Sequence, residues 1–165
     1  MLTDHPLVQR AVVLWQRLAT ALDALQPAAA LAARLYVAQA FFLSGLTKIR
    51  DWETTLALFT DEYHVPLLPP ALAAPLGTAG ELVLPVLLVL GLGGRFAALG
   101  LSVVNVVAVL SLAEIAPAAF QQHVFWGSLL AGIAIYGPGQ WSVERLVWPR
   151  IAGRGSAALP RAATS

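Results

Sequence analysis

Apolar residues are concentrated in four runs, each about 20 residues long. An α-helix of that length crosses the hydrocarbon core of a bilayer. The short connections Gly93-Gly94-Arg95 and Ala116-Pro117 separate the last three runs, so the helices on either side of them must be antiparallel neighbours. The pattern predicts an all-α fold, an integral membrane antiparallel four-helix bundle formed by residues 28–49, 71–92, 96–115 and 118–136.

An amphipathic segment precedes the first run. Residues 1–27 place Gln9, Arg10, Gln16 and Arg17 opposite a continuous apolar face. We expect an interfacial helix, and the alternative is a cytoplasmic helix that binds a partner. The apolar face consists of Leu7, Ala11, Leu14, Trp15, Leu18, Leu22 and Leu25.

Two further short helices are predicted outside the spans. In the loop after the first run, Trp52, Leu56, Phe59 and Tyr63 recur at helical spacing and predict an interfacial helix that ends before Val65-Pro66. After the fourth run, Gly137, Pro138 and Gly139 stop the helix, and Ser142 predicts the N-cap of a short helix through Trp148. The expected organisation is an amphipathic helix at 1–27, a four-helix domain at 28–148 and a disordered cytoplasmic tail at 149–165.

The basic residues predict the orientation. If the N-terminus is cytoplasmic, only Lys48 and Arg50 lie outside, among the acids of residues 51–62, and Arg34 lies near the cytoplasmic face. Cytoplasmic loops carry the excess of Lys and Arg in membrane proteins. We therefore expect a multi-pass protein of the inner (plasma) membrane with both termini cytoplasmic. The arginines placed inside are Arg10, Arg17, Arg95, Arg145, Arg150, Arg154 and Arg161.

The composition agrees with this fold and excludes several functions. The chain is 58% hydrophobic and 12% charged, whereas about a quarter of the residues of a soluble domain are charged. A net charge of +1 without a basic cluster argues against a nucleic-acid partner. The absence of cysteine excludes thiolate nucleophiles and iron–sulfur clusters. We expect no metal site, no catalytic residue, no covalently bound cofactor and no stand-alone enzyme.

Glu81 is the most unusual residue, because it lies in the middle of the second apolar run. A charge near the bilayer midplane costs roughly 2.5–3.5 kcal/mol on insertion scales. Pro85, one turn later, cannot donate a hydrogen bond to the Glu81 carbonyl and predicts a kink that opens the bundle there. Glu81 is either a functional acid or a structural acid that is protonated or paired.

Three other polar residues of the spans are candidates for a site with Glu81. Arg34, Asn105 and His123 fall within the first, third and fourth runs. If all turn inward, Arg34 pairs with Glu81, and the set forms a ligand site or proton relay. Each has a simpler alternative: Arg34 snorkels to headgroups, Asn105 joins two helices, and His123 faces the interface. Lys48 is expected to be an outer-face anchor.

The order of these residues resembles the DoxX family. The resemblance covers about residues 30–148 and rests on Arg34, Phe42, Gly45, Lys48 and Asp51, on Pro66, on Gly80-Glu81, on Leu90-Gly91-Leu92 and Arg95, and on Tyr136-Gly137-Pro138-Gly139 with Ser142 and Glu144. It implies a small four-helix inner-membrane protein. Gly45, Lys48, Pro85, Gly91, Arg95, Gly137, Pro138 and Gly139 are assigned structural roles.

The resemblance also implies a redox context, since members are linked to membrane oxidoreductase and thiol-stress complexes. We expect a membrane subunit or anchor of a quinone- or thiol-linked system, with quinone as the candidate ligand and an oxidoreductase as the candidate partner. The missing cysteines weaken a thiol relay in this chain itself. The alternatives are a small transporter or channel-like protein that uses Glu81 as an ion or proton site, and a membrane assembly protein. A homo-oligomer is compatible with both alternatives.

Overall fold

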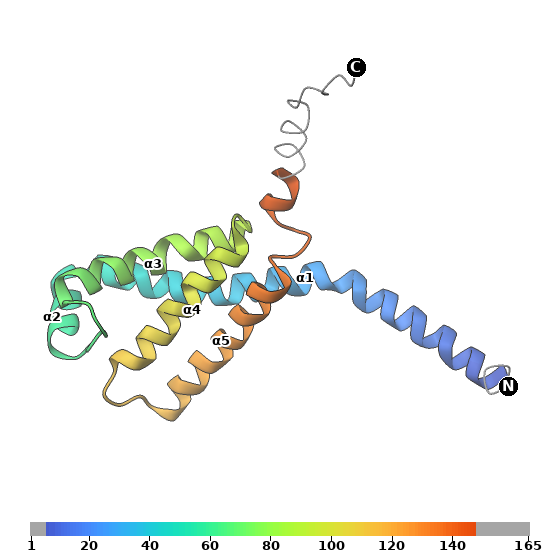
Figure 1. The fold of residues 1–165 in the computed structure, drawn as a ribbon, viewed down its shortest axis with the longest axis horizontal. Helices are drawn as coiled ribbons and strands as arrows, with labels where there is room; N and C mark the ends of the chain where they lie inside the picture. Colours follow the sequence, from blue (N-terminus) through green and yellow to red (C-terminus); the bar gives the residue numbers. More distant parts are fainter. Residues whose placement is uncertain (1–5, 148–165) are drawn as a thin grey trace, which may run out of the picture.

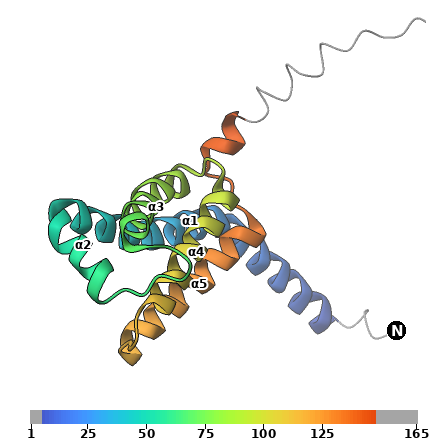
Figure 2. The same ribbon diagram turned by 60° about the vertical axis from the view of Figure 1, so that its left-hand side comes forward.

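The computed structural model describes residues 6–147, and within that range it is helical without strands. Helix α3 packs against α1 and α4, and α4 packs against α5, as both views of the ribbon show (Figures 1 and 2). The N-terminal half of α1 runs away from this bundle. The helices are α1 (Pro6–Arg50), α2 (Trp52–Asp61), α3 (Pro70–Leu90), α4 (Gly94–Ser111) and α5 (Pro117–Tyr136).

Helix α1 joins two predicted elements in one. The sequence pattern predicts an amphipathic helix at 1–27 separate from a span that begins at residue 28, but the structure has a single helix of 45 residues. Pro27 lies inside it and removes one backbone hydrogen bond without ending the helix. Such a helix is about 67 Å long, more than twice the roughly 30 Å hydrocarbon core of a bilayer.

Helix α2 confirms the short helix predicted in the long loop. Asp51 is its N-cap, and its side chain accepts a hydrogen bond from the Thr54 amide at 3.0 Å. The apolar face of α2 packs on α3, where buried Phe59 contacts Ala73 and Ala74. This small second core folds α2 back over one end of the bundle (Figure 1).

Prolines and glycines define the ends of α3 and α5. Both helices begin with proline, whose missing amide is unpaired in any first turn. Helix α3 ends at Gly91, which takes a left-handed conformation with φ of 64°.

The main hydrophobic core lies between the ends of the bundle. It is formed by Val37, Ala38, Phe41, Leu88, Ala97, Ala98, Leu101, Leu130 and Ile133.

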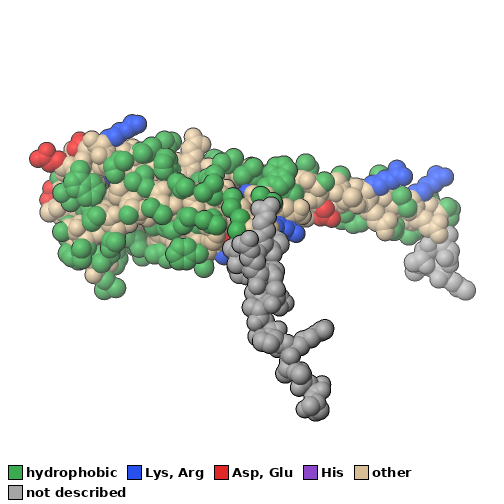
Figure 3. Space-filling view, turned by 90° about the horizontal axis from the view of Figure 1, so that it is seen from above, with side chains coloured by type: hydrophobic (Ala, Val, Ile, Leu, Met, Phe, Trp, Pro, Cys, Tyr) green, Lys and Arg blue, Asp and Glu red, His purple; other side chains and the backbone are tan. Residues whose placement is uncertain are grey.

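Three of the described helices, α1, α3 and α4, are long and apolar enough to cross a membrane. Helix α5 has 20 residues, but its first half carries Gln121, Gln122 and His123, and it is not among the three. The four-span arrangement therefore stays a prediction. Figure 3 shows apolar side chains over the visible face of the bundle, with acidic side chains gathered at the end that holds α2.

Candidate functional site

Glu81 forms an ion pair with Lys48. The Lys48 Nζ atom of α1 lies 2.5 Å from Glu81 Oε2 of α3 and also donates to Ser44 Oγ at 3.0 Å. The side chains of Lys48 and Glu81 are 18% and 10% exposed, so the pair is largely dehydrated. Two predictions are wrong here: Glu81 is not paired with Arg34, and Lys48 turns into the bundle instead of anchoring its outer face.

Gly45 explains why the two helices meet at this level. A Cβ atom built on Gly45 would lie 2.9 Å from the Leu82 side chain and 3.1 Å from Glu81 Cβ. Any larger residue would therefore push α1 and α3 apart. Lys48 is one turn beyond Gly45 on the same face of α1, which brings its ammonium group to the Glu81 carboxylate. The structural role predicted for Gly45 is close helix packing.

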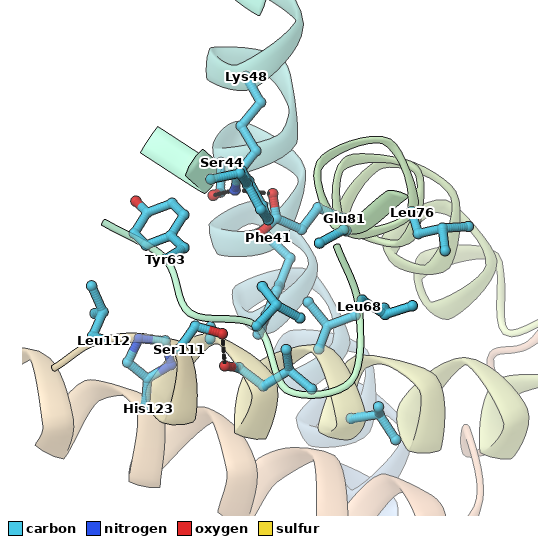
Figure 4. A pocket seen from close by; sticks show the side chains of 18 of the residues that line it. Phe41, Ser44, Lys48, Tyr63, Leu68, Leu76, Glu81, Ser111, Leu112 and His123 are labelled. Carbon is cyan, nitrogen blue, oxygen red and sulfur yellow. Dashed lines mark hydrogen bonds and ion pairs between the residues drawn. The ribbon is translucent and has the colours of Figure 1, made fainter. Parts of the chain in front are cut away.

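A cavity of about 450 Å³ lies beside the ion pair. Figure 4 shows Lys48, Ser44 and Glu81 converging on one side of it and His123 on another. Its wall beside Glu81 comes from the N-terminal half of α3, including Leu76 and Gly77. Pro85 lies outside this cavity and is buried against a second hollow, so the predicted opening of the bundle by Pro85 is not what forms it.

Asn105 and His123 contact each other across α4 and α5, which is the simpler role considered for Asn105; His123 lines the cavity, and Asn105 is not among its lining residues. The Asn105 amide nitrogen donates to the His123 carbonyl oxygen at 2.9 Å, and His123 Nδ1 lies 2.7 Å from Asn105 Oδ1. Because Oδ1 can only accept, Nδ1 carries the proton and Nε2 of a neutral ring is the acceptor. A Cβ on Gly127 would lie 3.3 Å from the Asn105 nitrogen, so this glycine gives the amide its space.

Arg34 lies away from this cavity, at the end of α3. Its side chain is fully buried, and it donates to the backbone carbonyls of Val89 and Trp141. Val89 lies in the last turn of α3, where helix carbonyls lack partners within the helix. Arg34 therefore ties the end of α3 to the segment after α5, and it does not line the cavity.

The segment after α5 packs on this same end of the bundle. Gly137 and Gly139 have φ of 86° and 83°, which favour glycine. A Cβ on Gly94 would lie 2.5 Å from Pro138, and one on Gly139 would lie 2.8 Å from Ala30. Arg95 donates to the Ile135 carbonyl at 3.3 Å. These contacts give the predicted structural residues their physical roles.

Two details of that segment differ from expectation. Ser142 donates its hydroxyl to the Gly139 carbonyl and does not accept from a helical amide. Glu144 instead accepts from the Gly94 amide at 3.3 Å, and its negative charge suits the N-terminus of α4. Residues 143–147 form the helical turn that was predicted, whereas Trp148 and the tail at 149–165 lie outside the described residues.

The cavity also holds polar residues that the sequence analysis missed as site residues. Lys48, Ser44 and Ser111 line it, as does Tyr63 from the loop after α2. Burial raises the pKa of the Tyr63 hydroxyl, and the charges of Glu62 and Glu81 raise it further, so the hydroxyl stays neutral at physiological pH. The available signal for Lys48 and Ser44 was their spacing, one turn apart beside Gly45 on α1.

Comparison with known proteins identifies the family. The family model for DoxX matches residues 29–114, which is more than half of the chain. The chain therefore belongs to the DoxX family, and the resemblance noted from the sequence is confirmed. No curated protein and no solved structure matches it. With its apolar helices, the chain is a multi-pass membrane protein.

Proposed function

We propose that this DoxX-family protein binds the headgroup of a membrane quinone in the cavity between Lys48–Glu81 and His123, as a non-catalytic subunit or anchor of a redox system. The observation that carries the proposal is a cavity with apolar and aromatic walls and polar groups on separate sides. Membrane-soluble ligands favour sites of this kind, in which a few polar groups orient the headgroup.

The polar groups match the two ends of a quinone. Quinone oxygens lie at opposite ends of the ring, where the Lys48 ammonium group is a donor to one carbonyl oxygen. The neutral His123 ring offers an acceptor at Nε2 to the hydroxyl of the reduced form. Trp126 lines the cavity, and its indole N–H is buried without an acceptor among the described residues. A ligand oxygen would satisfy such a donor.

A transport function is less compatible with the same geometry. A cation bound at Glu81 would lie beside the Lys48 ammonium group, which contacts the carboxylate at 2.5 Å and would repel a second positive charge. The chain has no cysteine and offers no electron carrier of its own. Electrons would therefore pass between the bound quinone and a partner oxidoreductase, which makes this chain the quinone-holding subunit.

The orientation of the protein is part of the proposal. We place both termini in the cytoplasm and the α2 end, with Lys48, outside the inner membrane. Arg95 and Arg145 lie with the Arg34 end of the bundle, whereas acids gather at the α2 end. Phosphatase and fluorescent reporters fused after Glu62 and after Ser165 should report an external and a cytoplasmic position. A fluorescent fusion after Glu62 would overturn the orientation.

Quinone binding is tested by filling the cavity without removing a polar group. Gly77 lines the cavity, and its Cβ direction meets only the tip of Phe59 at 3.7 Å, so Gly77→Leu places a side chain there. Gly132→Leu is the matched control, because nothing lies within 4 Å of its Cβ direction. The measurement is quinone co-extracted with the purified protein, together with the rise in melting temperature when a short-chain quinone is added.

We expect wild type and Gly132→Leu to retain quinone and to be stabilised by it. Gly77→Leu should lose both properties while staying folded. Glu81→Gln should weaken binding, because it removes the charge that holds Lys48 while nearly keeping the side-chain shape. A wild-type protein that carries no quinone and gains no stability from added quinone refutes the proposal, as does full retention by Gly77→Leu.

A further inference from the structure

We propose that the exposed face of α1 is the interface of a parallel homodimer. We call this face the α1 stripe. It runs from Leu7 to Ile49 in alternating steps of four and three residues, and it consists of residues 7, 11, 14, 18, 21, 25, 28, 32, 35, 39, 42, 46 and 49. No member is buried, and the first six are exposed: Leu7, Ala11, Leu14, Leu18, Ala21 and Leu25. The proposal is independent of the quinone site.

The spacing of the stripe is that of a coiled coil. Alternating steps of four and three average 3.5 residues per turn, which keeps a seam facing a partner helix along a left-handed supercoil. The buried residues of α1 that pack in the bundle, including Arg34, Phe41 and Gly45, lie off the stripe. Helix α1 therefore has one face for its own bundle and a separate apolar face without a partner among residues 6–147.

Gln39 is the one polar member of the stripe. It is exposed near the middle of the apolar run, and its amide makes no hydrogen bond with any described residue. Lipid tails cannot satisfy an amide, so a polar group facing hydrocarbon is costly. An amide both donates and accepts, so Gln39 can pair with Gln39 of a second copy across a two-fold axis. A single polar residue in a coiled-coil seam fixes the register in the same way.

The surface beside Gln39 has room for a partner's side chain. A hollow of about 290 Å³ lies between α1 and α3, lined by Leu35, Gln39 and Phe42 of the one and by Pro85 and Val86 of the other. A partner side chain that flanks the α1 seam could enter this hollow between the two helices. Two copies in one membrane share their orientation, so the paired helices would be parallel.

The contact is large enough for a stable dimer. The 45-residue helix is about 67 Å long, and a contact strip about 10 Å wide would bury roughly 1,300 Å² in total, within the range of specific interfaces. The N-terminal half projects from the bundle (Figure 1), and its members of the α1 stripe are exposed. A membrane surface would cover its leucines, but it would leave the amide of Gln39 unpaired, so a second copy is the better fit.

Cysteine cross-linking in native membranes tests the interface, since the chain has no cysteine of its own. Ala21→Cys and Leu35→Cys lie on the stripe. Gln16→Cys and Leu99→Cys are exposed controls, the first elsewhere on α1 and the second on α4. Mild oxidation should yield disulfide-linked dimers several-fold more efficiently from the stripe positions than from the controls. Equal yields at all four positions would refute the interface.

A second variant separates the dimer from membrane-surface binding. Gln39→Leu should lower the cross-linking yield of Ala21→Cys several-fold while the thermal melting of the bundle is unchanged, because Gln39 touches no core residue through hydrogen bonds. Lack of cross-linking at Ala21→Cys, with labelling of that position by a lipid-phase reagent, would show that α1 lies on the bilayer and would overturn the proposal. A Gln39→Leu protein that dimerises as well as the wild type would also contradict it.

Discussion

Arg34 and Lys48 are two inward-facing cations of one helix, and their surroundings differ completely. Arg34 is fully buried and, within the described part of the chain, donates only to the backbone carbonyls of Val89 and Trp141. Lys48 keeps some exposure, pairs with the Glu81 carboxylate and lines a cavity. The first cation closes an end of the bundle, whereas the second lies where a ligand could reach it.

The difference follows from the two side chains. A guanidinium group has five donors in a rigid fork and stays charged, so it can join carbonyls from two separate segments. Helix ends supply such carbonyls, with a partial negative charge that favours a cation. An ammonium group is a compact point charge on a flexible stem, which suits a carboxylate partner and an exchange of that partner for a ligand oxygen. Structural roles should therefore concentrate at Arg34 and binding roles at Lys48.

Replacing Arg34 should produce the largest loss of stability. Arg34→Met keeps an apolar stem but leaves two partly buried carbonyls without the Arg34 donor, at a cost on the order of 2 kcal/mol or more in total. The control is Arg95→Met, which removes an exposed arginine that also donates to a helix-end carbonyl, Ile135. The measurement is the melting temperature of each variant, purified in detergent, relative to the wild type. Equal melting temperatures for the two variants would show that Arg34 does not hold the bundle end.

Replacing Lys48 or Glu81 should give the next largest loss of stability. The two losses should be coupled to each other, whereas the losses at Arg34 and Glu81 should not. Lys48→Met or Glu81→Gln alone strands one largely buried charge and should cost about 2 kcal/mol, since the pair keeps some exposure. The double variant should cost clearly less than the sum of the two. Arg34→Met combined with Glu81→Gln should instead be additive, because Arg34 donates to the Val89 carbonyl in the last turn of α3 and makes no hydrogen bond with Glu81. Additive losses in the first cycle would mean that the ion pair is not formed in the membrane.

Much of the fold could be predicted from the sequence, because length and hydropathy decide which segments become helices. The runs at 71–92 and 118–136 became α3 and α5 within one or two residues. The stop of the last helix at Gly137, Pro138 and Gly139 was also predicted, whereas Gly91 lay inside the predicted second span and instead ends α3. The continuity of α1 through Pro27 was not predicted, because the proline was taken as a boundary although it costs a hydrogen bond without forcing a break.

The site was harder to predict, because depth along a helix does not specify which residue faces which. Depth alone brought Arg34 toward Glu81, but the contact at Gly45 fixes the register of α1 against α3 and places Lys48 there instead. Asn105 and His123 were singled out because both are polar in apolar runs that a tight turn makes neighbours; His123 lines the cavity, whereas Asn105 contacts His123 from α4. Tyr63 was missed as a site residue, because only the folding of α2 over the bundle brings its loop to the cavity.

The smallest effect is expected beside Lys48, at the exposed cap of α2. Hydrogen bonds from the Thr54 hydroxyl and then from its amide hold the pKa of the Asp51 carboxyl below its usual value. A carboxyl whose pKa is depressed by folding stabilises the fold above its unfolded pKa of about 4, and that stability is lost as pH falls through the lower folded value. The melting temperature should therefore decline below pH 4 in part through Asp51.

Two variants separate the charge of Asp51 from its capping. Asp51→Asn keeps a capping oxygen and should melt nearly as the wild type does at pH 7, with a shallower decline below pH 4. Asp51→Ala removes the cap and should melt slightly lower at every pH. Glu53→Gln, which removes a neighbouring charge without touching the cap, should leave the low-pH decline as steep as in the wild type. If the melting temperature of Asp51→Asn falls as steeply below pH 4 as that of the wild type, the hydrogen bonds from Thr54 do not depend on the charged carboxylate. In contrast to Lys48 and Glu81, the loss at Asp51 should not couple to quinone, because this side chain does not line the cavity.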